Sequence, residues 1–480
     1  MYYYIAGETF RSIAEAGPND ILKLHNQKGF FLQISSNIPV NTPDDRYQLE
    51  VVAKVWRDRI PDEVLEQWEN IERRLATLEN LVIYQTTMPK CFEELLTKVN
   101  NVKNKVEGIA YLSWLGLYKD LPNSKTIVPL WDKYKMKDEK LKQQQYVIDK
   151  YRRISESQFS LNIRNYLKQS SFDNWQWEEA EMLLLLETMF QELNFISTFN
   201  IQFSTLQEWL CDIYLHYFNV PFHNFKHCFM VTQMMYSLIW QLELRNILSE
   251  EDLLTLLISA ICHDLEHSGF SNVYHVNAQT MLARTYNDRS PLENHHCDVA
   301  FRILEKWGLL KSLSKEQYLE VRQGIIRCIL STDMAKHLNI LQDFEAVLND
   351  FNPEKKEHRL QLMSILIKVA DISNELRPLE VAEPWLECLL NEFFAQSDAE
   401  KLEGLPVTAF MDRETVVRSK SQVHFIKNVL LPLLQALARC FPKAVSLLIS
   451  PAHEALSYYE RQSQEYENDQ RNKEAAQKIS

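Results

Sequence analysis

Hydrophobic residues recur with a helical period through most of the second half of the chain. Between about residues 172 and 459, long apolar stretches such as MLLLLETMFQELNFI and RLQLMSILIKVA are joined by short polar or proline-containing links. Stretches of this length and composition are typical of buried helices. The pattern therefore predicts a mainly all-α domain over 169–462, with a long loop at 398–422 and a polar tail at 463–480.

The beginning of the chain has a different pattern. Residues 21–35 and 47–56 alternate like β-strands, the first stretch around a turn at 27–29, and residues 1–7 also read as a strand. We expect a small α+β module over 1–57. A helical linker region over 58–168 should follow it.

Part of this linker carries a repeating apolar seam. Hydrophobic residues are spaced alternately by four and three positions, at Val64, Trp68, Ile71, Leu75, Leu78 and Val82. Such a seam is typical of a helix that packs against another helix. Two interpretations stay open: the helix packs on its own domain, or it joins two chains in a homodimer.

Composition narrows the class of protein. Only 9 of the 480 residues are glycine, which is about 2% against a usual ~7%. Neither a dinucleotide-binding motif nor a P-loop occurs in the sequence. The formal net charge of −13 makes nucleic acid and anionic membrane surfaces unfavourable partners, although a small anionic substrate held by metal ions is compatible with it.

Cysteine usage and hydropathy favour a reducing compartment. The eight cysteines are scattered and include no C-x-x-C pair, which is typical of reduced, buried thiols. No uninterrupted apolar run approaches the ~18 residues of a membrane span, and no signal-peptide pattern is found. We therefore expect no membrane span and a cytoplasmic location.

Histidines concentrate in one stretch of the chain. Eight of the 13 histidines lie in 216–296. The string HNFKH places His223 and His227 four residues apart, a spacing that shares one face of a helix. The string HDLEHSGFSN places His263 next to Asp264. Imidazole and carboxylate are ligands of zinc-like ions, and a carboxylate has two oxygens with which to bridge two ions. The stretch therefore predicts a two-metal site.

A site of this kind needs one more anionic ligand from a distant helix. Asp371 follows a strongly apolar helical stretch, so we expect its carboxylate to be nearly buried. A buried carboxylate requires a cation or a hydrogen-bond partner. Asp333, in STDMAKH, is the alternative ligand.

The series of motifs resembles a known family. HNFKH, HDLEHSGFSN, SPLENHH, STDMAKH, DISNELRP and SQVHFIKNVLLP occur in this order. They resemble the catalytic domain of class I cyclic-nucleotide phosphodiesterases, within the wider HD-type metal hydrolases. Longer strings, among them SPLENHHC and EGLPVTAFMDRE, are most similar to the ninth, cGMP-specific family. The resemblance covers roughly 170–460 and implies a compact all-helical catalytic domain.

The resemblance implies a set of metal ligands and catalytic groups. The ligands of a tight, zinc-like ion are implied to be His227, His263, Asp264 and Asp371. Asp264 would also bridge to a second ion, magnesium or manganese. His223 becomes the general acid that protonates the leaving O3′, and Glu293 and His267 lie around the attacking water.

The resemblance also implies a pocket for the cyclic nucleotide. Gln422 reads the purine edge and Phe425 stacks on the ring, while Asn374 and Phe393 line the same pocket. Substrate contacts are implied for His223, Asp264, Asp371, Asn374, Phe393, Ser421, Gln422 and Phe425.

The chain departs from the family's pattern at three positions. Ser268 stands where proline is usual, and Glu266 stands where aspartate is usual. We expect both to perturb little. His424 replaces a small residue and adjoins the residues that contact the base.

The implied reaction is the metal-dependent hydrolysis of 3′,5′-cyclic GMP to 5′-GMP, which terminates cyclic-nucleotide signalling. A phosphodiesterase that prefers cAMP or accepts both nucleotides is an alternative. A different HD-type nucleotide phosphohydrolase would share the metal ligands but should lack the pair Gln422 and Phe425. A catalytically inactive regulator would lack a ligand or the acid, and neither is missing from the sequence.

Overall fold

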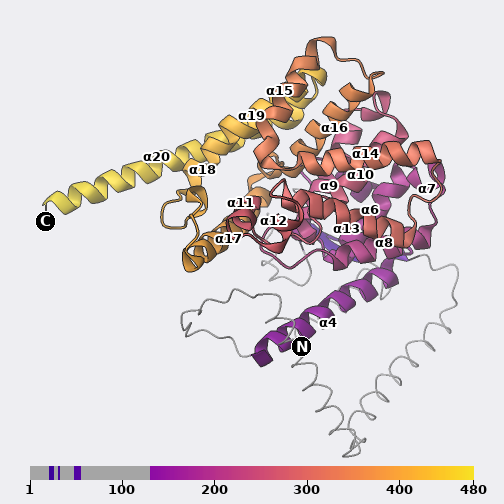
Figure 1. The fold of residues 1–480 in the computed structure, drawn as a ribbon, viewed down its shortest axis with the longest axis horizontal. Helices are drawn as coiled ribbons and strands as arrows, with labels where there is room; N and C mark the ends of the chain where they lie inside the picture. The colour runs from indigo at the N-terminus through magenta and orange to yellow at the C-terminus, as the bar shows by residue number, and fades with distance from the viewer. Residues whose placement is uncertain (1–20, 26–30, 33–47, 56–129, 480) are drawn as a thin grey trace, which may run out of the picture. The chain divides into compact units, whose positions relative to one another are not determined.

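The computed structural model describes residues 21–25, 31–32, 48–55 and 130–479 (Figure 1). Met1–Lys54 and Tyr146–Ser480 form one compact unit, and Val55–Gln145 forms another. The strand predicted at 1–7 and the apolar seam over 64–82 lie outside the described residues. Among the described helices, none is both long enough and apolar enough to cross a lipid bilayer.

Helices follow one another from residue 130 onward, and those from about residue 172 lie where the hydrophobic pattern predicts them. The first are α4 (Leu130–Ile154), α5 (Leu161–Leu167), α6 (Glu179–Glu192), α7 (Phe195–Thr198), α8 (Phe203–Leu215), α9 (Phe225–Gln241) and α10 (Glu250–Cys262). They continue as α11 (Asn272–Asn277), α12 (Met281–Thr285), α13 (Pro291–Trp307), α14 (Lys315–Ser331), α15 (His337–Val347) and α16 (Lys356–Asp371). The last are α17 (Leu379–Glu403), α18 (Arg418–Phe425), α19 (Leu431–Cys440) and α20 (Ser450–Ile479).

Helix α10 lies at the centre of the helical domain. Every residue of α10 from Leu253 to Cys262 is buried, and the helix packs against α9, α14 and α16. A helix that is apolar on all faces is stable only inside a core. The crossing with α14 is close, since a Cβ added at Gly324 would lie 2.7 Å from Cγ2 of Thr255. The packing of α10 against its neighbours therefore fixes the position of its C-terminal end in the core.

A small sheet completes the fold of this unit. Its strands are β1 (Ile21–His25), β2 (Phe31–Leu32), β3 (Gln48–Val55) and β4 (Ser157–Phe159), in the order β2-β1-β3-β4. β1 pairs antiparallel with both β2 and β3. The first three strands lie where the alternating pattern predicts them. β4 comes from the region expected to be a helical linker, and the domain boundaries proposed from the sequence stay predictions.

Two expectations about the C-terminal part are wrong. The segment 398–422 is not one loop, because α17 extends to Glu403 and α18 begins at Arg418. Gly404, with a φ of 68°, ends α17 in the left-handed conformation that favours glycine. The polar tail is helical, because α20 runs to Ile479 through residues with good helix propensity and without glycine. Gly404 therefore begins a shorter loop over 404–417, and a polar composition alone does not prevent a helix.

Candidate functional site

Three buried helix ends meet at one place in the core. His227 lies in the first turn of α9, His263 and Asp264 directly follow α10, and Asp371 is the last residue of α16. The three helices pack against one another in pairs. Because the C-terminus of a helix carries a partial negative charge, the ends of α10 and α16 favour a cation at this position.

The ligand atoms of these four side chains face one another. Oδ2 of Asp264 lies 3.0 Å from Nε2 of His263 and 3.4 Å from Nε2 of His227. Oδ1 of Asp371 lies 3.3 Å from Nε2 of His227 and 3.4 Å from Nε2 of His263. One ligand atom from each residue lies within 4.8 Å of the others. Two imidazole nitrogens and two carboxylate oxygens form a donor set that suits a zinc-like ion.

The charges of this cluster also suit a cation. Burial alone would raise the pKa of Asp264 and Asp371, but the neighbouring histidines hold the pKa of both carboxyls well below the usual range. Burial alone would lower the pKa of His263, yet the charge of Asp264 raises it well above its usual value. Two carboxylates so close together, one buried at Asp264 and one half-buried at Asp371, therefore require a positive charge between them. A bound cation supplies that charge in place of a proton on the imidazole.

Asp333, the alternative ligand, makes other contacts. Its Oδ2 accepts a hydrogen bond of 2.6 Å from Oγ of Ser290, and its Oδ1 accepts one of 2.9 Å from the N–H of Ala335. It thereby caps the 3₁₀ turn η4 (Met334–Lys336). The structure brings Asp371, and not Asp333, to the two histidines and Asp264.

His223 lies before α9 and not on it. The N-cap of α9 is Asn224, whose Oδ1 accepts from the N–H of Lys226 at 2.9 Å and of His227 at 3.2 Å. The prediction that His223 and His227 share one helix face is therefore wrong, because the helix begins after His223. The ring centroids of the two histidines are still only 5.6 Å apart, and the ring of His223 stacks on His267 at 3.9 Å.

Glu392, on α17, holds His223 in position. Its Oε1 accepts from Nδ1 of His223, and its Oε2 accepts from the N–H groups of Phe222 at 2.8 Å and His223 at 3.2 Å. Glu392 is not among the site residues predicted from the sequence. The available signal was a carboxylate inside the apolar string LLNEFF, since a buried acid needs a partner.

The charges around His223 favour its protonated form. Burial lowers the pKa of His223, but the negative charges of Glu392, Asp264 and Asp371 outweigh burial and raise the pKa to about 9. Against the effect of burial, the charge of His223 lowers the pKa of Glu392 to about 2. The pair is therefore an imidazolium and a carboxylate at neutral pH. An imidazolium so placed can act as a general acid.

His267 is neutral beside this imidazolium. Burial, and then the positive charge of His223, lower the pKa of His267 well below its usual value. Its Nδ1 accepts the N–H of Gly269 at 3.1 Å, which leaves the ring proton on Nε2. Gly269 has a φ of 81°, a conformation that other residues rarely adopt. The neutral ring is therefore oriented as a hydrogen-bond donor.

Helix α13 contributes two further groups near Asp264. Both oxygens of Glu293 accept from Nδ2 of Asn272, at 3.2 and 2.9 Å, and burial and the charge of Asp333 raise the pKa of Glu293 to about 7. His296, three residues along the same helix, places Nε2 3.8 Å from Oδ1 of Asp264. His296 is not among the site residues predicted from the sequence, but it faces the cluster.

The residues expected to contact the base come from three elements. Asn374 begins the 3₁₀ turn η6 (Asn374–Leu376), Phe393 lies on α17, and Ser421, Gln422 and Phe425 lie on α18. Gln422 and Phe425 are three residues apart and so share a helix face. Asn374 and Gln422 are buried.

Gln422 is available for a ligand. Its Oε1 is buried and has no hydrogen-bond partner within the part of the chain that the structure describes. Buried polar atoms usually have partners, so this atom is suited to accept a hydrogen bond from a bound molecule. His424, by contrast, is exposed and its Nδ1 lies 3.0 Å from Nδ2 of Asn428. Phe393 meets Phe410 edge to face at 5.9 Å.

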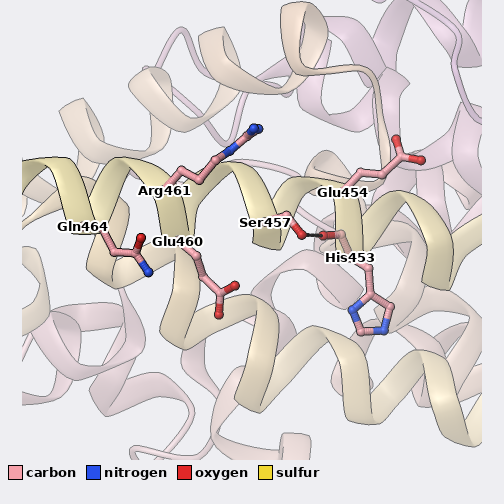
Figure 2. A pocket seen from close by; sticks show the side chains of 6 residues that line it. All are labelled: His453, Glu454, Ser457, Glu460, Arg461 and Gln464. Atoms are coloured by element: carbon pink, nitrogen blue, oxygen red, sulfur yellow. Dashed lines mark hydrogen bonds between the residues drawn. The ribbon is translucent and has the colours of Figure 1, made fainter.

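The hollow in Figure 2 is a different feature. The residues that line it all come from α20 and are His453, Glu454, Ser457, Glu460, Arg461 and Gln464. None of them belongs to the cluster of helix ends or to the expected base pocket. A hollow on one helix also brings no residues together from separate elements, so we assign it no role in the site.

The sequence of this chain is similar to those of known proteins. Residues 222–450 match the family model described as 3′5′-cyclic nucleotide phosphodiesterase. The high affinity cGMP-specific 3′,5′-cyclic phosphodiesterase 9A of Drosophila melanogaster is 47% identical over 368 residues, which are 76% of this chain and 23% of that protein. The Homo sapiens protein of the same name is 47% identical over 296 residues, 61% of this chain and 50% of that protein. This chain spans half or less of the length of these two relatives.

A solved structure resembles the fold. The phosphodiesterase domain of the RhoPDE fusion protein from the choanoflagellate Salpingoeca rosetta aligns with a TM-score of 0.60 and 33% sequence identity. The alignment covers 63% of this chain and 97% of that domain. The predicted mainly helical fold class is therefore confirmed.

Proposed function

Because this chain belongs to the class I 3′,5′-cyclic-nucleotide phosphodiesterase family, we propose that it hydrolyses 3′,5′-cyclic GMP to 5′-GMP and so terminates a cyclic-nucleotide signal. One observation carries the reaction type: His227, His263, Asp264 and Asp371 place ligand atoms within 4.8 Å of one another. The choice of cGMP rests on the similarity to relatives that are named as cGMP-specific.

The cluster would hold two divalent ions. His227, His263, Asp264 and Asp371 would hold a zinc-like ion, and Asp264 would also contribute to holding magnesium or manganese. When bound, such ions offset the charge of the phosphodiester and lower the pKa of a coordinated water toward ~7. We assign Glu293 to hydrogen bonds with waters of this region.

His223 would supply the proton for the leaving group. Cleavage of the bond between phosphorus and O3′ produces an alkoxide, which leaves poorly unless it is protonated. Glu392 engages Nδ1 of His223, so Nε2 is the nitrogen that gives the proton. The carboxylate keeps the ring oriented and stays ionised when the ring becomes neutral. Because the stacked ring of His267 is neutral, it adds no second positive charge that would compete with His223 for the carboxylate of Glu392.

Recognition of the base would fall to α18. The side chain of Gln422 has an acceptor and donors on one amide, so it can pair with the O6 and N1–H edge of guanine. The same amide, rotated, can pair with adenine. Phe425, one turn along the helix, would stack on the ring, with Asn374, Phe393 and Ser421 around it. Selection between the bases therefore depends on groups that fix the orientation of the amide.

An assay of the purified chain with cGMP, cAMP and a deoxynucleoside triphosphate separates the alternatives. The proposal expects hydrolysis of cGMP to 5′-GMP, loss of that activity after dialysis against a chelator, and recovery with Mg²⁺ or Mn²⁺. Equal turnover of cAMP would leave a dual-specificity phosphodiesterase. Cleavage of the triphosphate alone would indicate another HD-type phosphohydrolase, and no turnover of any of them would indicate a binding protein.

Two further proposals rest on the sequence. The seam over 64–82 would pair two chains as a homodimer, and light scattering of the full chain at micromolar concentration tests this. The described cysteines are free thiols, which fits a reducing compartment such as the cytoplasm. Fractionation of cells that express the chain tests the compartment.

A further inference from the structure

A lysine from the small sheet is buried in the helical domain. Lys23, in the middle of β1, is only 2% exposed. Its Nζ donates to Oε2 of Glu181 at 2.6 Å and to the main-chain oxygen of Gln176 at 2.6 Å. The same atom lies 4.8 Å from the centre of the Trp177 ring. A buried ammonium with three such partners is a specific contact, since an unpaired charge could not stay there.

The carbonyl that Lys23 contacts belongs to a short turn that supports a tryptophan. Gln176 is the last residue of the 3₁₀ turn η2 (Asn174–Gln176). Oδ1 of Asn174, which is fully buried, accepts from Nε1 of Trp385 at 3.1 Å. The ring of Trp175 packs on the ring of Trp385 at 4.6 Å. The turn therefore sets the position of Trp385 on α17.

Trp385 in turn supports the residue that precedes His223. The rings of Trp385 and Phe222 meet at 5.6 Å, and Phe222 packs on His227 at 4.6 Å and on His223 at 4.9 Å. Phe222, Met230, Val381 and Trp385 form a cluster separate from the main core. Small satellite clusters have fewer neighbours to fix them than one continuous core has.

We infer that Lys23 is a positioning residue for the catalytic histidine. Through η2, Trp385 and Phe222, it sets the segment whose N–H groups, at Phe222 and His223, donate to Glu392. The small sheet thereby helps to position the residues of the site. The inference rests on the proposed function only where a change in kcat for cGMP is interpreted as a change in the position of His223.

The test compares variants of the full chain. Lys23→Met removes the charge and the donors at similar length, whereas Lys23→Arg retains both. The matched control is Lys168→Met. Lys168 also pairs with a half-buried carboxylate, Glu192 at 2.7 Å, and its Nζ lies 4.3 Å from the centre of the Trp240 ring, outside the cluster around Phe222 and Trp385. If Lys23→Met does not fold, the double variant Lys23→Met/Glu181→Gln is used instead, because it leaves no buried carboxylate without its partner.

Two readouts are measured on each variant. For Lys23→Met we expect kcat for cGMP to fall by about threefold to tenfold with KM within about twofold, which is the usual size of coupling through packed side chains. Hydrogen exchange at the amides of Phe222 and His223 should become at least about fivefold faster, because local opening governs exchange there. Lys23→Arg should keep kcat and the exchange rates close to those of the wild type, and Lys168→Met should change neither kcat nor the exchange rates.

Hydrogen exchange decides the inference without any turnover. Unchanged exchange at Phe222 and His223 in Lys23→Met would overturn it, as would an equal increase in all parts of the chain, which would indicate only lost stability. If the wild-type chain proves to have no phosphodiesterase activity, the proposed function fails, but faster exchange confined to these amides would still support the positioning role.

Discussion

Replacing Glu392 by glutamine should produce an activity defect that grows with pH. Glutamine has nearly the same shape, but it lacks the charge and keeps only one acceptor oxygen. That oxygen can still accept from the N–H groups of Phe222 and His223, while the amide nitrogen faces Nδ1 of His223 and favours the neutral ring. The charge of Glu392 is the largest influence that raises the pKa of His223 against burial. The variant should therefore keep the geometry of the site and lose the proton of the acid at a lower pH.

The size of the effect follows from the two pKa values. In the native site the pKa of His223 is about 9, whereas the ordinary value is 6.5. The protonated acid is present below the pKa and is lost as pH rises through it. At an ordinary pKa, about a tenth of the rings are protonated at pH ~7.5, about three quarters at pH ~6, and about one in a hundred at pH ~8.5. For a variant in which His223 has its ordinary pKa, we expect kcat/KM to fall less than about twofold at pH 6, about tenfold at pH 7.5 and about 75-fold at pH 8.5, where about three quarters of the native rings are still protonated.

The assay is a pH profile of kcat/KM for cGMP at constant ionic strength. Glu387→Gln, an exposed change on the same helix, is the control and should follow the wild type at every pH. The metal content of each preparation is measured, so that loss of ions is not read as loss of the acid. A defect of equal size from pH 6 to pH 8.5 would refute the reasoning, because Glu392 would then act through geometry alone.

Three further changes test other parts of the structure. Asp371→Asn should reduce the divalent metal retained after dialysis at least about tenfold, measured by plasma mass spectrometry, while the circular dichroism stays that of a helical protein. Gln422→Ala should weaken the binding of both cGMP and cAMP and remove much of the preference for cGMP in kcat/KM. His424→Ala, at an exposed position, should leave that preference unchanged. Gly324→Ala should lower the free energy of unfolding in urea by about 1–3 kcal/mol, because the new Cβ lies 2.7 Å from Thr255, and Thr255→Ser should relieve the clash.

The parts of the site that sequence reasoning found are those with a local signal. His263 and Asp264 adjoin each other, and His227 lies within a short histidine motif. Asp371 follows an apolar helical stretch that had to be buried. In each case the chemistry could be inferred from neighbouring residues, and the core then brought the helix ends together.

The parts that were missed depend on contacts between distant segments. Glu392 lies 169 residues from His223, and Glu181 lies 158 residues from Lys23. Nothing close to either acid in the sequence identifies its partner. His296 is not among the predicted site residues, because its orientation toward Asp264 depends on how α13 packs. The loop expected over 398–422 is shorter than predicted, because α17 continues to Glu403, where the left-handed Gly404 ends it, and α18 begins at Arg418.

The most direct test of the central claim is a competition between the two cyclic nucleotides. The metal-loaded full chain is mixed with equimolar cGMP and cAMP, and the two 5′-monophosphates are followed in the same tube, which gives the ratio of the kcat/KM values. The account predicts that 5′-GMP forms at least ~100-fold faster, a difference of ~2.7 kcal/mol in transition-state stabilisation, and that a chelator abolishes both products. Comparable rates would contradict the assignment of cGMP, and undiminished turnover in metal-free protein would contradict the role of His227, His263, Asp264 and Asp371.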